Sequence, residues 1–269
     1  MTKKMYVLFI FIIACFYVLF SNYSLSDALK LNEKAIDKIS LFSNKDTYSF
    51  IATGDNRDGP DIYKNILKQS AKHKPAFMIN TGDFISRGTI AEYNEYVNLI
   101  KPALFPIINV IGNHDINAQQ GRKVYNQYFG ECNFYFDFGK DRFIFLDTND
   151  GLSNNRLNWL EKLLSEKKRY KFVSMHKPPY TMIWSHSFSA NSKKFMQLVE
   201  KYKVNYALCG HIHAFDKLVQ NNVNYIITGG GGAPVYPLPI FHSKSGGGFY
   251  HYLLMQVSSK GIKETLVKL

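Results

Sequence analysis

The chain has 269 residues and a mass of 31.0 kDa, with 46% hydrophobic and 20% charged residues. It is therefore long enough for one ordinary globular domain, and it is neither a disordered tail nor a collagen-like rod. Its 33 lysines and arginines exceed its 21 aspartates and glutamates, and the net charge of +12 makes phosphate esters, nucleic acid and acidic lipid head groups candidate partners. Three cysteines are too few for a disulfide framework, which excludes a disulfide-stapled miniprotein.

The chain begins with an apolar segment typical of exported proteins. Two lysines precede a run from Met5 to Phe20 that contains no charged side chain. This pattern is an export signal, and its length lies between a signal-peptide core and the roughly 20 residues of a membrane-spanning helix. We therefore expect residues 1–21 to be a cleaved signal peptide or an N-terminal membrane anchor, with a buried helix as the less favoured alternative. The protein is then extracytoplasmic, either secreted or membrane-associated through residues 5–20.

The rest of the chain divides into a linker and a domain. Residues 22–46 are polar with weak helical spacing, which favours a linker or stalk. Over residues 47–269, short apolar runs alternate with helical patterns, which predicts an α/β domain. Strands are expected at 48–53, 76–80, 107–111, 134–138, 142–147, 171–175, 206–209, 225–228 and 250–257, with a hairpin turn at 139–141. Helices are expected at 61–72, 89–100, 122–129, 155–167 and 190–202.

Two cysteines and many lysines lie within the predicted domain. Cys132 and Cys209 could pair in an oxidising compartment, but two buried unpaired thiols are the favoured interpretation. The lysines look scattered over the predicted helices and not clustered, which favours a basic solvated surface over a binding patch.

Five of the predicted strands end in residues that bind divalent metals. The segments are TGDNR (53–57), NTGD (80–83), IGNHD (111–115), SMHKPP (174–179) and CGHIH (209–213). Ligands of open α/β sheets bind outside the carboxyl ends of strands, so we expect these ends to converge on one crevice. A glycine before the polar residue allows a sharp turn off the strand. Each motif alone is weak, since Gly-Asp is usually a turn, but packing needs do not explain the ordered set of five.

Together these motifs resemble those of the calcineurin-like metallophosphoesterases, the superfamily that includes purple acid phosphatases and phosphoprotein phosphatases. The motifs cover residues 55–213, and similarity extends to 138–147, 159–161 and 229–233. The residues alone indicate only an α/β fold with a crevice at the strand ends. The resemblance implies more, namely a four-layer α/β/β/α sandwich with two mixed β-sheets and a dinuclear metal centre bridged by one carboxylate.

Six side chains match the metal ligands of this superfamily. Carried over position by position, they are Asp83 as the bridging ligand, Asp55 and His213 for the first metal, and Asn113, His176 and His211 for the second. Carboxylate, amide and imidazole donors suit Mn, Fe or Zn. A pair of such ions about 3.5–4 Å apart is the standard device for in-line displacement at phosphorus, where it activates water and offsets phosphoryl charge.

The motif that contains Asn113 also supplies a catalytic candidate. The resemblance implies that His114 meets the phosphate and the leaving group, either as a proton donor or as a stabiliser of charge, and that Asp115 orients the His114 ring. General acid assistance of this kind contributes on the order of 10²–10⁴ in rate.

Arg57 departs from the family pattern. Many members have a histidine ligand of the first metal at this position, but a guanidinium has no lone pair to offer, so the first metal keeps three protein ligands. Ser86 stands where purple acid phosphatases have a tyrosine, so their coloured iron centre is not supported. We expect Arg57 to bind a substrate phosphate, with a surface salt bridge to Asp58 or Asp61 as the alternative.

The leading interpretation is an exported, metal-dependent hydrolase of phosphate monoesters that uses metal-activated water. The first alternative is a phosphodiesterase acting on nucleotides, nucleic acid or phospholipid head groups, because the same chemistry serves both. The second is a non-catalytic phosphate-binding protein on the same scaffold. The expected partner is a phosphorylated small molecule or polymer, and no specific protein partner is implied.

Overall fold

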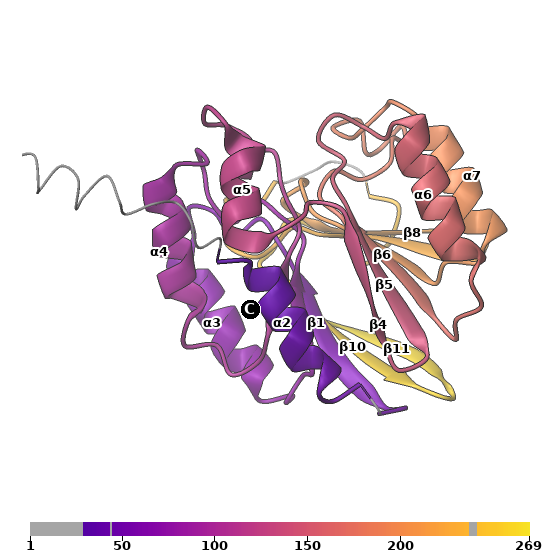
Figure 1. Ribbon diagram of the computed structural model, residues 1–269, viewed down its shortest axis with the longest axis horizontal. Helices are drawn as coiled ribbons and strands as arrows, with labels where there is room; N and C mark the ends of the chain where they lie inside the picture. The colour runs from indigo at the N-terminus through magenta and orange to yellow at the C-terminus, as the bar shows by residue number, and fades with distance from the viewer. Residues whose placement is uncertain (1–28, 44, 237–240) are drawn as a thin grey trace, which may run out of the picture.

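The computed structural model describes residues 29–43, 45–236 and 241–269 and contains two mixed β-sheets packed face to face, with helices outside each sheet (Figure 1). This arrangement confirms the predicted four-layer sandwich. The predicted signal peptide or anchor, 1–21, lies outside the described residues. Among the helices that are described, none has both the length and the apolar character needed to cross a bilayer.

The first sheet has five strands in the order β11-β10-β1-β2-β3. The strands are β1 (Tyr48–Thr53), β2 (Phe77–Asn80), β3 (Ile107–Asn109), β10 (His251–Ser258) and β11 (Gly261–Lys268). β1, β2 and β3 run parallel, while β10 is antiparallel to β1. The helices α3 (Pro60–Ala71), α4 (Ile90–Ile100) and α5 (Gly121–Phe129) share an outer apolar cluster with this sheet. Thr89 and Glu92 form a capping box that fixes the start of α4.

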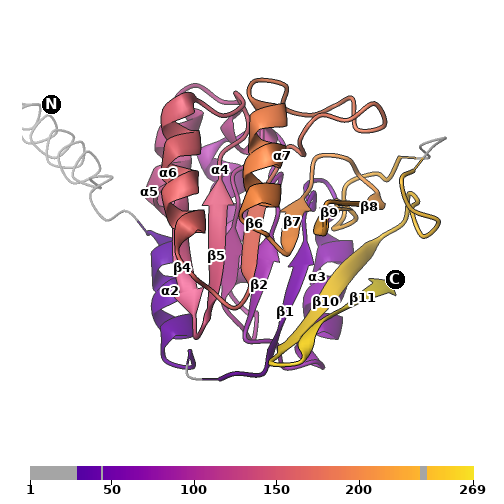
Figure 2. The same ribbon diagram turned by 90° about the vertical axis from the view of Figure 1, so that its right-hand side faces the viewer.

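The second sheet has six strands in the order β4-β5-β6-β7-β9-β8. The strands are β4 (Phe134–Phe138), β5 (Asp141–Leu146), β6 (Lys171–Met175), β7 (Tyr206–Cys209), β8 (Phe215–Gln220) and β9 (Val223–Thr228). Its outer face packs on α6 (Asn154–Ser165) and α7 (Ser192–Lys201) (Figure 2). A short 3₁₀ helix, η1 (His114–Ile116), follows β3.

Aromatic rings fill the space between the two sheets. Phe143 stacks on Phe172 with ring centroids 4.6 Å apart, and Phe50 meets Phe143 edge-on at 5.3 Å. Because each sheet is covered on both faces, its central strands are almost wholly apolar and need no alternating pattern. For this reason, continuous apolar runs in the sequence predict the positions of the central strands.

All nine predicted strands and all five predicted helices are present, with small shifts at their ends. Two further strands, β8 and β11, were not predicted. Both lie at the edges of their sheets and have partly exposed, charged sequences, FDKLVQ and GIKETLVK. Edge strands carry such charges because these discourage pairing with other chains, and the charges hide the strand from an apolar-run search.

The predicted linker, 22–46, is wrong over much of its length. Residues Leu31–Ser40 form helix α2, whose buried side chains Asn32, Ala35 and Ile39 pack into the body of the sandwich. The Asn32 side chain donates to the Asn109 carbonyl at 2.9 Å and accepts from the Asn109 N–H at 2.8 Å. These two bonds satisfy the free edge of β3, so the folded body begins before the predicted boundary at residue 47.

Cys132 and Cys209 are both buried free thiols, as the favoured interpretation expected. Cys132 belongs to the apolar cluster outside the first sheet, and Cys209 belongs to the cluster outside the second. The two sheets lie between them, so this fold does not allow them to pair.

Candidate metal centre

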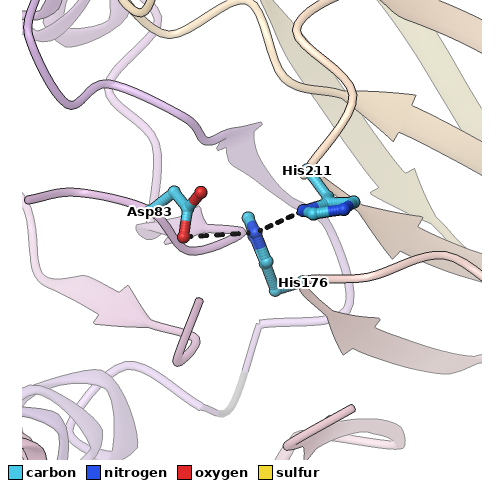
Figure 3. A group of neighbouring side chains, drawn as sticks. All are labelled: Asp83, His176 and His211. Carbon is cyan, nitrogen blue, oxygen red and sulfur yellow. Dashed lines mark hydrogen bonds and ion pairs between the residues drawn. The ribbon is translucent and has the colours of Figure 1, made fainter. Parts of the chain in front are cut away.

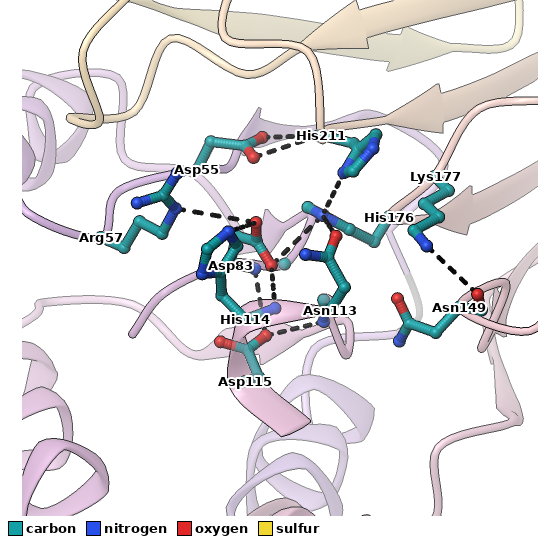
Figure 4. Close-up of polar contacts among 12 residues, drawn as sticks. Asp55, Arg57, Asp83, Asn113, His114, Asp115, Asn149, His176, Lys177 and His211 are labelled. Atoms are coloured by element: carbon teal, nitrogen blue, oxygen red, sulfur yellow. Dashed lines mark hydrogen bonds and ion pairs between the residues drawn. The ribbon is translucent and has the colours of Figure 1, made fainter. Parts of the chain in front are cut away.

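Five loops meet at the carboxyl ends of β1, β2, β3, β6 and β7, and they come from both sheets (Figure 4). Each loop brings one of the predicted residues Asp55, Asp83, Asn113, His176 and His211. The predicted convergence of distant motifs on one place is therefore confirmed.

The backbone is unusual at three of these positions. Asp55, Asp83 and His211 have φ values of 57°, 54° and 71°, in the left-handed region that costs energy for residues other than glycine. The glycines of the motifs serve mainly to leave space. A Cβ atom on Gly112 would collide with the Asp83 carboxylate, and one on Gly210 would crowd Asp55. In these motifs the acidic residues and His211 have a strained backbone, and the Asp55 and Asp83 carboxylates lie directly against the backbone of Gly210 and Gly112.

Three donor atoms gather around Nε2 of His176, which is fully buried, and complete a set of four. Asp83 Oδ1, Asn113 Oδ1 and His211 Nδ1 each lie 3.2 Å from this nitrogen. The donor atoms of Asp83, His176 and His211 all lie within 4.8 Å of one another (Figure 3). His176 Nδ1 bonds to the Thr81 carbonyl at 2.9 Å, which assigns the proton to Nδ1 and leaves Nε2 free to coordinate. This set of two imidazoles, one carboxylate and one amide oxygen fits a single Mn, Fe or Zn ion.

Asp55 and His213, the expected ligands of a first metal, lie next to this set. The Asp55 carboxylate accepts from the His211 N–H at 2.9 and 3.1 Å and lies 3.6 Å from His213 Nε2. His213 Nδ1 bonds to the Pro234 carbonyl at 2.8 Å, so its Nε2 faces Asp55. The His213 ring also stacks on Tyr236 with centroids 4.5 Å apart.

Arg57 lies on the same side of the centre as Asp55. Its Nε is 3.8 Å from Asp83 Oδ2, the oxygen opposite to the one that faces His176, and its Nη1 is 2.6 Å from Asp58. The alternative bridge to Asp58 is therefore present, whereas Asp61 pairs with Lys64. Arg57 Nε is buried and has no hydrogen-bond partner within the described residues. A fixed positive charge thus stands beside the carboxylate oxygen that a first metal would share.

His114 and Asp115 do not make the expected contact. His114 Nδ1 bonds to the Ser86 carbonyl at 2.8 Å, and His114 Nε2 lies 4.0 Å from Asp83 Oδ2. The carboxylate of Asp115 instead accepts four backbone N–H groups, at 2.7 to 3.2 Å, from Asp83, Phe84, Ile85 and Gly112. Asp115 therefore organises the two loops that carry Asp83 and Asn113, and the carbonyl of Ser86 orients the His114 ring.

The charges of the site favour a cation at the centre of the donor set. Burial alone would lower the pKa of His176, but the neighbouring Asp83 outweighs burial and raises it to about 9, so without a metal Nε2 holds a proton where a bound cation would displace it. Burial likewise opposes ionisation of Asp83, yet His176 and the hydrogen bond from the His114 N–H hold the pKa of Asp83 below its usual range. Burial raises the pKa of Asp55 to about 7. Burial and the charge of His176 lower the pKa of His211 to about 3, so its ring is neutral and can act as a ligand.

Several positioning residues escaped the sequence reading. Thr81, Ser86 and Pro234 act through backbone carbonyls, which no side-chain motif reveals. Lys177 follows a predicted ligand directly, and its Nζ donates to the Asn149 carbonyl at 3.2 Å beside the donor set (Figure 4). Its position next to His176 was the one sequence signal available.

Comparison with known proteins places these motifs in a family. The model of the family described as calcineurin-like phosphoesterase matches residues 32–215. A probable glycerophosphodiester phosphodiesterase, GpdQ, of Arcobacter nitrofigilis is 32% identical over 182 residues, which cover 60% of this chain and 66% of that protein. A probable cyclic nucleotide phosphodiesterase of Moraxella catarrhalis is 27% identical over 188 residues, covering 60% of this chain and 67% of that protein. The solved structure of purple acid phosphatase PPD1 from yellow lupin has the same fold, with a TM-score of 0.69, 14% identity, and coverage of 84% of this chain and 52% of that one.

Proposed function

Because this chain belongs to the calcineurin-like phosphoesterase family, we propose that it is a metal-dependent hydrolase of phosphate esters that acts preferentially on phosphodiesters. The observation that carries this proposal is the gathering of Asp83, Asn113 and His211 donors around Nε2 of His176, each at 3.2 Å. Such a set, built from four separate loops of two sheets, has a ready explanation only as a cation site.

A metal bound by these side chains would lower the pKa of a water molecule and offset charge on phosphoryl oxygens. The protein's own residues supply the rest. The Ser86 carbonyl accepts the Nδ1 proton of His114, so the neutral ring has a lone pair at Nε2 and must take up a second proton before it can protonate a leaving group. Asp83, 4.0 Å from that nitrogen, stabilises the resulting imidazolium. His114 is 30% exposed, which lets a leaving group reach it.

The choice of phosphodiesters reverses the ranking that the sequence alone favoured. Two of the curated relatives are described as phosphodiesterases, and the first is 32% identical to this chain. A comparison of bis-p-nitrophenyl phosphate with p-nitrophenyl phosphate, after reconstitution with Mn, Fe or Zn in turn, tests the proposal. We expect the higher kcat/KM on the diester. A higher value on the monoester would restore the original order, and no hydrolysis of either by protein with bound metal would indicate a phosphate-binding protein.

We propose that Arg57 holds a phosphoryl oxygen of the substrate. Its guanidinium is only 16% exposed and stands beside Asp83, with a buried Nε that has no partner in the described part of the chain. A planar guanidinium is well suited to bind phosphate through two N–H groups. In Arg57→Ala we expect the KM for the preferred ester to rise about tenfold, which corresponds to roughly 1.4 kcal/mol. Arg87→Ala is the matched control, because Arg87 is 79% exposed and bonds to Glu92 away from the ligands. An unchanged KM in Arg57→Ala would refute substrate binding by Arg57 and leave the salt bridge to Asp58 as its role.

We also propose that the protein acts outside the cytoplasm. The support is the lysine-led apolar run over residues 5–20. Fractionation of cells that express the full chain tests this, with the protein expected in the membrane or extracytoplasmic fraction. Recovery in the cytoplasmic fraction alone would refute it.

A further inference from the structure

The excess positive charge of the protein collects at the end of the sandwich opposite to the metal centre. This end, called here the basic end, consists of five helix-to-strand loops that lead into parallel strands together with three hairpin turns. It comprises residues 41–43, 45–47, 72–76, 101–106, 139–140, 166–170, 202–205, 221–222 and 259–260. In Figure 2 the segment between α2 and β1 and the turn between β10 and β11 lie at the lower end of the molecule. Contacts such as the bond from Tyr48 to Asp141, at 2.8 Å, show that both sheets contribute to the same end.

The two ends of the sandwich carry opposite charge. The basic end contains ten lysines and arginines against two carboxylates, a net charge of +8. The loops at the other end contain seven carboxylates against four cations, a net charge of −3, over the described residues 54–59, 81–89, 110–120, 130–133, 147–153, 176–191, 210–214, 229–236 and 241–250. The expectation of scattered lysines fits the nine that lie on the described helices, but it misses the loops, because the alternation of helix and strand returns every loop that precedes a parallel strand to one place.

Most cations of the basic end have no partner. Within the described residues, seven of its exposed lysines lie beyond ion-pair distance of any carboxylate, namely Lys45, Lys72, Lys74, Lys101, Lys167, Lys203 and Lys260. The carboxylate of Asp46 is shared by Lys140 and Arg169. The field of this end is therefore largely uncompensated and favours an anionic partner.

Large apolar side chains stand among these lysines. Leu104 is 85% exposed, Leu41 77% and Phe42 58%, and they are three of the five most exposed large apolar side chains in the described part of the chain. Phe42 and Leu104 border one shallow hollow together with Lys45 and Lys74. Exposed apolar side chains ringed by cations are typical of surfaces that lie on a bilayer, where the apolar groups enter the acyl boundary and the cations meet anionic head groups.

We propose that the basic end is a docking surface for an anionic lipid bilayer. Each lysine near such a surface contributes attraction, and the apolar tips add burial that a purely electrostatic partner would not provide. Nucleic acid is the less suitable occupant, because Leu41 and Leu104 are aliphatic and only Phe42 offers a ring on which a base could stack. The metal centre then faces away from the bilayer, so its substrate is a soluble ester and not a lipid of the membrane on which the protein rests.

The test uses the full chain with Cys15→Ser, because Cys132 and Cys209 are buried. An environment-sensitive fluorophore is attached to Leu104→Cys, or to Met182→Cys as the matched control, since Met182 is 92% exposed at the opposite end. Each protein is mixed with vesicles of pure phosphatidylcholine or of phosphatidylcholine with 40% phosphatidylglycerol. The apolar N-terminal segment, with Lys3 and Lys4, is present in every sample, so the probe at position 182 and the lysine variant report any lipid preference of that segment.

We expect a blue shift of the probe at position 104 with phosphatidylglycerol only, and no lipid-dependent change at position 182. Replacing Lys45, Lys74 and Lys101 by glutamate should remove at least half of this shift, and 0.5 M salt should reduce it as well. The thermal midpoint of the triple variant should match that of the parent, because all three side chains are exposed. Equal spectra in the two lipids, a shift at position 182, or a response to duplex DNA without one to vesicles would overturn the proposal.

Discussion

The replacement Asp115→Asn tests how the two central loops are held. Each carboxylate oxygen of Asp115 accepts two backbone N–H groups, Oδ1 from Phe84 and Ile85, and Oδ2 from Asp83 and Gly112. An asparagine has only one such oxygen, and its NH₂ group would face two of these donors. Two buried N–H groups lose their acceptor at roughly 1–3 kcal/mol each, so the free energy of unfolding should fall by roughly 2–6 kcal/mol. In a domain of this size that lowers the thermal midpoint by on the order of 10 °C.

The same replacement should weaken metal binding. The loop that carries Asp83 is positioned by the Asp115 carboxylate, so we expect the Kd for Mn²⁺ from titration calorimetry to rise at least tenfold. Asp141→Asn is the matched control. Asp141 is the first residue of β5, at the end of the sandwich away from the metal centre. It is fully buried and accepts hydrogen bonds from Tyr48, Arg169 and Tyr170. The control should lower the thermal midpoint without changing the Kd. If Asp115→Asn melts and binds Mn²⁺ like the parent but loses kcat, then Asp115 acts on His114 after all and the role inferred from its contacts is wrong.

Three further outcomes follow from the structure. Arg57→His replaces a fixed charge by a lone pair next to Asp83, so metal analysis after dialysis should find about one more ion per chain than in the parent, whereas Arg87→His should bind no more than the parent. His114→Ala should lower kcat by on the order of 10²–10⁴ on esters with poor leaving groups, with an unchanged metal content, and an equal loss on p-nitrophenyl esters would argue against proton donation. Burial lowers the pKa of His251 to about 4 from an ordinary 6.5, so the folded state favours the neutral ring. Stability should therefore be complete above about pH 6.5 and decline by up to about 3 kcal/mol as the pH falls toward 4, and denaturant titrations of His251→Asn should lack this component of the slope.

Strands that are buried on both faces could be predicted from the sequence. Elements whose position depends on a polar contact between distant residues could not. β6 is buried on both faces, so its composition alone reveals it. Helix α2 was missed because the amide of Asn32, which bonds to the edge of β3, contributes as much to its docking as any apolar side chain. A buried asparagine in a polar stretch cannot be told from a solvated one before its partner is known.

The metal centre shows the same division. The donor residues could be identified from the motifs, because Asp, Asn and His side chains at strand ends supply the coordinating atoms directly. Their supports are backbone carbonyls, such as those of Thr81 and Ser86, and these depend on the path of the chain and not on its side chains. The role of Asp115 was misread for this reason, since adjacency in sequence to His114 does not bring the two side chains together on η1.

The charge polarity of the molecule, in contrast, was within reach of the sequence. In a fold built from alternating helices and parallel strands, every loop that leads into a parallel strand lies at one end and every loop that follows a parallel strand lies at the other. Sorting the charges by loop type, instead of along the chain, separates a net +8 from a net −3 without coordinates. The lysines of these loops looked scattered because the loops that hold them are about 25 to 55 residues apart in sequence. Their gathering opposite the metal centre places the proposed membrane contact and the proposed chemistry at opposite ends of one rigid body, so that neither obstructs the other.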